Sequence, residues 1–185
     1  MTHGRVEVVG RIERRKVVEG VALFVTIAEI AGVFVGFAAL ISVTRRSEIE
    51  APQLAQIQAV VTSGLLVVVA ALVPVGLTFY NVTGHGLWVA ASVIYLALNW
   101  MVILFALQRS ANREQARAQA RQSPIGAAFF WMMELAIQVP LLLIIFGVNS
   151  DLDVAFYMTA LVFHLFEAAF ILAQLVYAQA GKHRA

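Results

Sequence analysis

Three glutamates are the only charged residues in long apolar stretches of the sequence: Glu29, Glu134 and Glu167. Each lies near the middle of a stretch long enough to cross a bilayer. At about 1.5 Å of rise per helical residue, all three lie within roughly 5 Å of one plane. A charged side chain at that depth costs about 2.5 to 3.5 kcal/mol. We therefore expect each carboxyl to be neutralised by a proton, by a cation or by hydrogen bonds from a neighbouring helix.

Other polar side chains recur at helical spacing on the faces that carry these glutamates. His164 lies one turn before Glu167 in the sequence, for example. The simplest packing gathers such faces into one interior site or subunit interface at mid-depth. The expected site comprises Glu29, Glu134, Glu167, His164 and Asn99. The polar side chains expected to support it are Gln138, Tyr95 and Tyr157.

Three chemistries suit this set of residues. A single divalent cation is one candidate, with Glu29, Glu134, His164 and Glu167 as its ligands, because carboxylates and imidazole bind such ions and the ion offsets their charge. Protons on the carboxyls are a second, as in a relay or a coupled transport site. A glutamate paired with His164 would also suit general acid–base catalysis on a lipid-like substrate. Alternatively, each carboxyl is protonated and only holds helices together.

The available ligands argue against several cofactors. The chain has no cysteine, which excludes thiolate zinc sites and iron–sulfur clusters. A carboxylate-bridged pair of metals needs two Glu-x-x-His units, and the nearest counterpart is one His-x-x-Glu unit at 164–167. His164 is the one histidine within an apolar stretch, so ligation of haem by two histidines is disfavoured. We expect no haem and no iron–sulfur cluster.

The elements that position these residues follow from the composition. Of 185 residues, 61% are apolar and 13% are charged, whereas a soluble domain is about 45–50% apolar and about 25% charged. This excludes a soluble globular protein. Because a run of about 20 apolar residues crosses the hydrocarbon core, the sequence predicts an all-α membrane protein with a bundle of five spanning helices. The expected spans are 21–43, 54–80, 87–107, 125–148 and 154–177.

Two spans carry signals for helix packing. In the first, Gly32-x-x-x-Gly36 is a small-residue pattern that lets another helix approach closely, and Glu29 shares its face. We therefore expect Glu29 to face protein rather than lipid. In the second, Pro74 frees a backbone carbonyl that a neighbouring helix must satisfy. Since span 54–80 otherwise carries mainly hydroxyl side chains near its middle, we expect it to be the most lipid-exposed helix.

The segments outside the spans are mostly basic. Residues 1–20 form a basic amphipathic segment expected to lie at the membrane interface, residues 21–180 form the membrane domain, and residues 181–185 form a polar tail. Four arginines recur every four residues after the third span, so on a helix they form a stripe that suits anionic lipid headgroups or an acidic partner. A determinant of topology is the alternative. These residues are Arg109, Arg113, Arg117 and Arg121.

The distribution of Lys and Arg predicts the orientation. Placing the more basic side in the cytoplasm puts the N-terminus outside and the C-terminus in the cytoplasm, and we expect the membrane to be a bacterial inner membrane. A net charge of +2 is no signature of nucleic-acid binding. The expected partners are membrane lipids and further copies of this chain.

The sequence supports three hypotheses of function. The leading one is an oligomeric ion or proton channel or carrier with a Glu/His/Asn site at mid-depth. The second is an intramembrane enzyme that uses a glutamate and a histidine, or a single metal ion, on a lipid-like substrate. The third is a non-catalytic assembly subunit held together by the face of Gly32 and Gly36. No catalytic residue is identified, and transport is favoured over catalysis.

Overall fold

The structure, a computed structural model, describes residues 3–44, 51–108 and 124–182. These residues form five long α-helices and a short 3-10 turn, with no strand among them. In a bilayer the backbone must satisfy its own hydrogen bonds, and within a single segment only a helix does so. The elements are α1 (His3–Thr44), α2 (Ala51–Thr78), α3 (His85–Gln108), α5 (Pro124–Ile145), η1 (Ser150–Leu152) and α6 (Asp153–Lys182).

All five helices are long and apolar enough to cross a membrane, which confirms the prediction of an all-α bundle with five spanning helices. Two connections end their helices through residues with positive φ. Gly147 and Asn149 follow α5, and Asn81 and Gly84 lie between α2 and α3. Gly and Asn tolerate this left-handed region better than other residues do. The apolar segments lie at Val21–Thr44, Gln53–Thr78, His85–Ala106, Ala128–Ile145 and Ser150–Tyr177.

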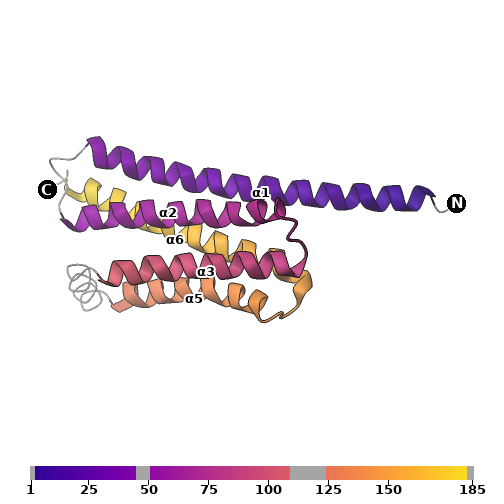
Figure 1. Cartoon of the computed structure of the whole chain (residues 1–185). Helices are drawn as coiled ribbons and strands as arrows, with labels where there is room; N and C mark the ends of the chain where they lie inside the picture. The colour runs from indigo at the N-terminus through magenta and orange to yellow at the C-terminus, as the bar shows by residue number, and fades with distance from the viewer. Residues whose placement is uncertain (1–2, 45–50, 109–123, 183–185) are drawn as a thin grey trace.

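Helix α2 carries the most buried of the five apolar segments. It packs against α1, α3 and α6, while α5 packs against α3 and α6 on the other side (Figure 1). The expectation that this span is the most lipid-exposed helix is therefore wrong. A membrane helix with few polar side chains need not face lipid, because small residues on its surface let other helices pack closely against it. Ala70, Ala71 and Gly64 supply such a surface on α2.

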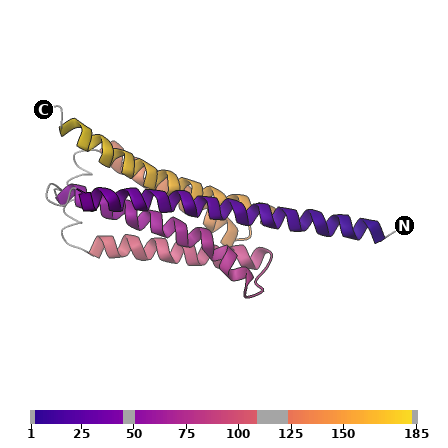
Figure 2. The same cartoon turned by 90° about the horizontal axis from the view of Figure 1, so that it is seen from above.

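The first half of α1 extends beyond the other helices. Figures 1 and 2 show the helix continuing without a break from its start at His3 into the bundle. Its 42 residues correspond to about 63 Å, about twice the thickness of the hydrocarbon core. The side chains of residues 3–20 lie outside the described part, so their placement at the membrane interface stays a prediction.

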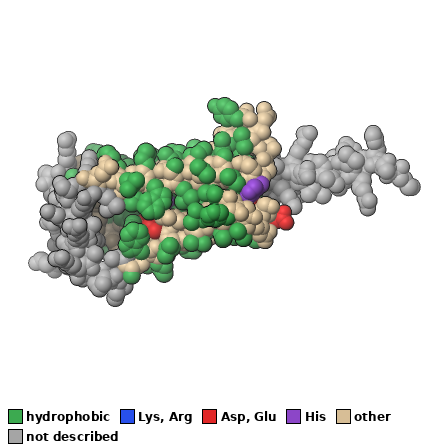
Figure 3. Space-filling model, turned by 60° about the horizontal axis from the view of Figure 1, so that its bottom comes forward, with side chains coloured by type: hydrophobic (Ala, Val, Ile, Leu, Met, Phe, Trp, Pro, Cys, Tyr) green, Lys and Arg blue, Asp and Glu red, His purple; other side chains and the backbone are tan. Residues whose placement is uncertain are grey.

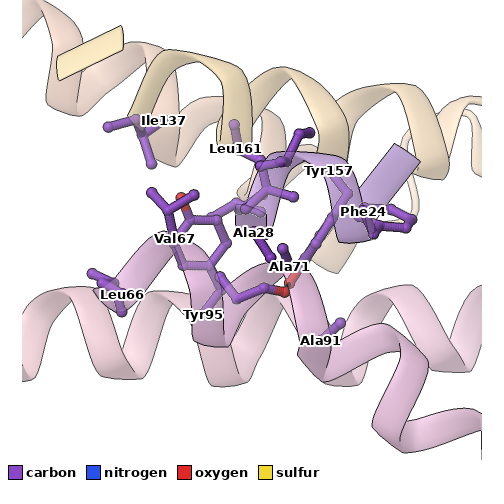
Figure 4. Packing of buried hydrophobic residues seen from close by; sticks show 14 of the residues in the cluster. Phe24, Ala28, Leu66, Val67, Ala71, Ala91, Tyr95, Ile137, Tyr157 and Leu161 are labelled. Carbon is purple, nitrogen blue, oxygen red and sulfur yellow. Dashed lines mark hydrogen bonds between the residues drawn. The ribbon is translucent and has the colours of Figure 1, made fainter. Parts of the chain in front are cut away.

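Aromatic rings pack together inside the bundle, in the half near the α2–α3 and α5–α6 connections, and Figure 4 shows Phe24, Tyr95 and Tyr157 among them. Phe24 of α1, Trp88 of α3 and Tyr157 of α6 meet with ring centroids 5.6 to 6.0 Å apart. Tyr95 of α3 extends this cluster toward the middle of the bundle, 5.9 Å from the Tyr157 ring. The outward face in Figure 3 is mainly hydrophobic, as expected for a surface in contact with lipid.

Candidate functional site

Glu134 of α5 lies at the centre of a buried polar cluster. Its Oε2 atom accepts hydrogen bonds from Asn99 Nδ2 of α3 and from Gln138 Nε2, one turn further along α5, each at 3.1 Å. The Glu134 side chain is buried, and so is Asn99. Two amide donors on one oxygen favour a fixed position for the carboxyl group. The structure thus brings together three of the polar residues that the sequence singled out.

Glu167 of α6 faces the same interior and lies close enough to Glu134 for the two charges to interact. Both residues are largely buried, with 4% of Glu134 and 6% of Glu167 exposed. The apolar segments of the five helices contain no Lys or Arg, so neither carboxyl has a cationic partner within them. Two carboxyls on helices that pack against each other are therefore buried without a cationic side chain in the apolar segments.

His164 lies one turn before Glu167 on the same face of α6. Its Nδ1 atom is 2.9 Å from the Tyr95 hydroxyl, and the two rings stack with centroids 5.9 Å apart. When Nδ1 carries no proton, the hydroxyl is the donor. Both residues are buried. Tyr95 therefore sets the orientation of the imidazole beside the two carboxyls.

Glu29 does not join this group within one chain. Its side chain is exposed on α1, on the same outward face as Gly32 and Gly36. A Cβ added at either glycine would meet nothing within 4 Å. The expectation that this face contacts another helix is not met inside the protomer, because α1 turns its alanine-rich side, with Ala31 and Ala38, inward instead.

Tyr157 has a structural partner rather than a place in the polar cluster. Its hydroxyl donates to the backbone oxygen of Ala70 at 2.7 Å. Pro74, four residues later in α2, has no N–H to give to that oxygen. The prediction that a neighbouring helix satisfies the freed carbonyl is confirmed.

Two further predictions concern metal and lipid binding. Within residues 3–44, 51–108 and 124–182, no group of three or more His, Asp or Glu could hold a metal ion. The candidate ligands Glu29, Glu134, His164 and Glu167 thus do not form one such group there, and a bound divalent cation stays a prediction from the sequence. The stripe of Arg109, Arg113, Arg117 and Arg121 lies outside the described residues.

A second polar pair lies at one end of the bundle, where the sequence indicated only connections. His85, the first residue of α3, places Nδ1 2.6 Å from Oδ2 of Asp153, the first residue of α6. In a five-span chain the α2–α3 and α5–α6 connections lie at the same end. The sequence has a histidine at the α2–α3 connection and an aspartate at the α5–α6 connection. Topology combined with residue type could therefore have suggested this pair.

Comparisons of the chain with protein-family models, with curated proteins and with solved structures found no match. The class of protein therefore rests on the fold. It is a small polytopic α-helical membrane protein, with a buried polar cluster between α3, α5 and α6.

Proposed function

We propose that the protein moves protons across the membrane and that the Glu134–Glu167 pair is where these protons bind. The supporting observation is that two carboxyls from neighbouring helices lie together in the interior, and that Glu134 is held by Asn99 and Gln138. Intramembrane carboxyls without a basic partner are energetically costly, and where they occur they commonly mark a path for ions or protons.

The chemistry of the cluster suits protons better than a divalent cation. Calcium takes about six to eight oxygen ligands, whereas the side chains around Glu134 include two amide donors that direct hydrogen toward its oxygen. Glu134 and Glu167 supply two buried carboxyls on helices that pack against each other, and a carboxyl can bind and release a proton. A proton can bind and leave such a pair through small changes in hydrogen bonding.

His164 supplies a further polar group in the same interior. It lies one turn from Glu167 and contacts the Tyr95 hydroxyl, which can donate or accept a hydrogen bond. A chain of exchangeable groups thus extends from the carboxyl pair toward the end of the bundle that holds the α2–α3 and α5–α6 connections. The proposed role is that of a proton channel or carrier.

The test is proton flux through the full chain reconstituted into liposomes. A pH-sensitive dye is trapped inside the vesicles, and a potassium gradient with valinomycin drives the flux. We expect flux above that of protein-free vesicles, and at least a tenfold loss for Glu134→Gln and for Glu167→Gln. Glu29→Gln is the matched control, because it makes the same change at similar depth but outside the cluster, and it should conduct like the wild type.

The proposal fails if wild-type vesicles leak no faster than protein-free vesicles, or if both Gln variants in the cluster conduct normally. Size-exclusion chromatography and circular dichroism of each variant would show that the fold is kept. The isosteric change from Glu to Gln removes the titratable carboxyl group while it retains the size and a hydrogen-bonding capacity.

A further inference from the structure

We propose that His85 and Asp153 form the site at which protons are loaded at one end of this path. The inference rests on the proposed function, because it assigns a route to the carboxyl pair of Glu134 and Glu167. The two residues come from the start of α3 and the start of α6, on the side of the bundle that holds the two short connections (Figure 1).

The pair joins the surface to the interior. The His85 side chain is 41% exposed, whereas that of Asp153 is 2% exposed, and their Nδ1 and Oδ2 atoms are 2.6 Å apart. With Asp153 ionised, Nδ1 of His85 is the donor, because a carboxylate can only accept. The other ring nitrogen then holds a free lone pair on the exposed side chain. In the proposed site, this nitrogen is the atom that accepts a proton from water.

Asp153 presents an unused polar atom to the interior. Its Oδ1 atom is buried and makes no hydrogen bond within the described part of the chain. The position of Asp153 at the start of a long helix favours its negative charge, but a purely structural contact with His85 uses only Oδ2. A buried polar oxygen of this kind is commonly satisfied by an ordered water molecule.

Helices α3 and α6 carry polar groups in matching layers inward from this pair. They run parallel, and partners are separated by 68 residues for His85–Asp153 and 69 for Tyr95–His164. Tyr95 is ten positions beyond His85 in the sequence, or about 15 Å along α3. Between these two layers, Ser92 has a buried Oγ atom that makes no hydrogen bond among the described residues. Ser92 Oγ and Asp153 Oδ1 are thus two buried polar atoms, one on α3 and one on α6, that make no hydrogen bond within the described residues.

The polar residues of α3 and α6 continue as far as Glu134 and Glu167. Asn99, one turn beyond Tyr95, donates to Glu134, and Glu167 is one turn beyond His164. Water molecules bound at Asp153 Oδ1 and Ser92 Oγ would bridge the distance that side chains alone do not cover. The Trp88 and Tyr157 rings, 5.6 Å apart between centroids, pack along the same stretch of α3 and α6.

The loading step makes and breaks only bonds to hydrogen. A proton from bulk water binds at Nε2 of His85, and the Nδ1 proton passes to the carboxylate of Asp153. The protonated carboxyl then gives a proton to water on its interior side. The exposed imidazole then returns to its starting tautomer by exchange with bulk water, which accepts the proton from Nε2 and gives one to Nδ1. This exchange adds no net proton, so that one proton has entered and the pair has regained its charge.

The experiment uses the same liposomes and three variants of the full chain. His85→Gln can still hydrogen-bond to Asp153 but cannot take up a proton, and we expect it to conduct at least tenfold more slowly than the wild type. Asp153→Asn should show a similar loss. Asp151→Asn is the matched control, since Asp151 is exposed in the same connection, and it should leave the flux unchanged.

Chemical rescue separates loading from a structural role. His85→Ala should lose flux, and imidazole added to the buffer at millimolar concentration should restore it toward the wild-type rate. Loss of flux that imidazole does not restore would show that the pair only joins the two helices, and would overturn the inference.

The two proposals fail in different ways. If Glu134→Gln abolishes flux while His85→Gln and Asp153→Asn conduct normally, the loading site is wrong and the proposed function stands. If wild-type vesicles show no flux, both are wrong. If Asp153→Asn does not fold, His85→Gln still tests the loading site, because the His85 side chain is 41% exposed.

Discussion

The Tyr157 hydroxyl of α6 donates a hydrogen bond of 2.7 Å to the Ala70 carbonyl oxygen of α2. Pro74 leaves this oxygen without its helical donor, and a bilayer interior offers no water in its place. The contact therefore holds α6 against α2 at a position where the α2 backbone needs a side-chain donor. The same helix α6 carries His164 and Glu167, so this bond also helps to position the polar cluster.

Tyr157→Phe should destabilise the protein by about 1 kcal/mol, because the Ala70 carbonyl would be left without a donor. Unfolding in detergent, followed by circular dichroism, measures the change. Tyr177→Phe is the control, since the Tyr177 side chain is exposed. Pro74→Ala restores an N–H to α2, so Tyr157→Phe should cost less in that background. An equal cost in both backgrounds would contradict this explanation.

The glycine that matters for packing inside the protomer is Gly64 rather than Gly32. A Cβ at Gly64 would lie 2.6 Å from Val35 Cγ2 and 3.4 Å from the Ala31 backbone oxygen of α1, whereas one at Gly32 would meet nothing within 4 Å. Gly64→Leu should therefore separate α1 from α2 and lower stability by about 1 to 3 kcal/mol. Gly32→Leu should leave the stability of the monomer unchanged. Similar melting temperatures for the two variants would contradict the close approach of α1 to α2.

Much of the polar cluster could be predicted from residue type and depth. Glu134, Glu167 and Asn99 are polar groups in apolar helices, and the cost of facing lipid places such groups inside. The same rule failed for Glu29 within the protomer. Helical spacing shows which residues share a face, but it does not show which face turns inward. On α1 the packing of small alanines decided that choice.

The His85–Asp153 pair could not be found by helical periodicity. The two residues are 68 positions apart and each starts a different helix. Helical spacing relates residues within one helix, so it cannot link them to each other. The five-span topology places both residues at the same end of the bundle, but their contact also depends on which helices are neighbours, and that requires the tertiary structure. Proline chemistry was more informative, because Pro74 predicts an unsatisfied carbonyl wherever the neighbouring helix lies.

Asn99 and Gln138 should contribute unequally to the carboxyl pair. Both donate to Glu134 Oε2 at 3.1 Å, but Asn99 is buried, whereas Gln138 is partly exposed and can be replaced by other donors more easily. Asn99→Leu should therefore reduce proton flux in liposomes more strongly than Gln138→Leu does. Asn99→Asp would add a third carboxyl to the cluster and should lower stability as well, since buried like charges repel each other.

A result in which Gln138→Leu is the more damaging variant would contradict this order. A control for packing is Leu98→Ile, which changes a neighbouring apolar residue on α3 without removing a donor. It should keep the flux within a factor of about two, because volume-conserving changes are well tolerated.

The prediction of a homo-oligomer can be tested on the exposed face of α1. Glu29 lies there beside Gly32, and a charged carboxyl facing lipid costs about 2.5 to 3.5 kcal/mol, so a second copy seated on this face would relieve that cost. The chain has no cysteine, which gives a clean background. In membranes under oxidising conditions, Gly32→Cys should form a disulfide-linked dimer, because small residues let two helices approach to the distance of about 4.4 to 6.8 Å between Cα atoms that a disulfide needs.

The matched control is Ala97→Cys, an exposed small residue at comparable depth on α3. Random collisions in the membrane would cross-link both variants at similar rates, whereas a specific contact through α1 would cross-link Gly32→Cys alone. Gly36→Cys lies one turn further along the same face and should cross-link as well. Equal cross-linking at Ala97, or none at either glycine, would show that α1 does not meet a second copy there.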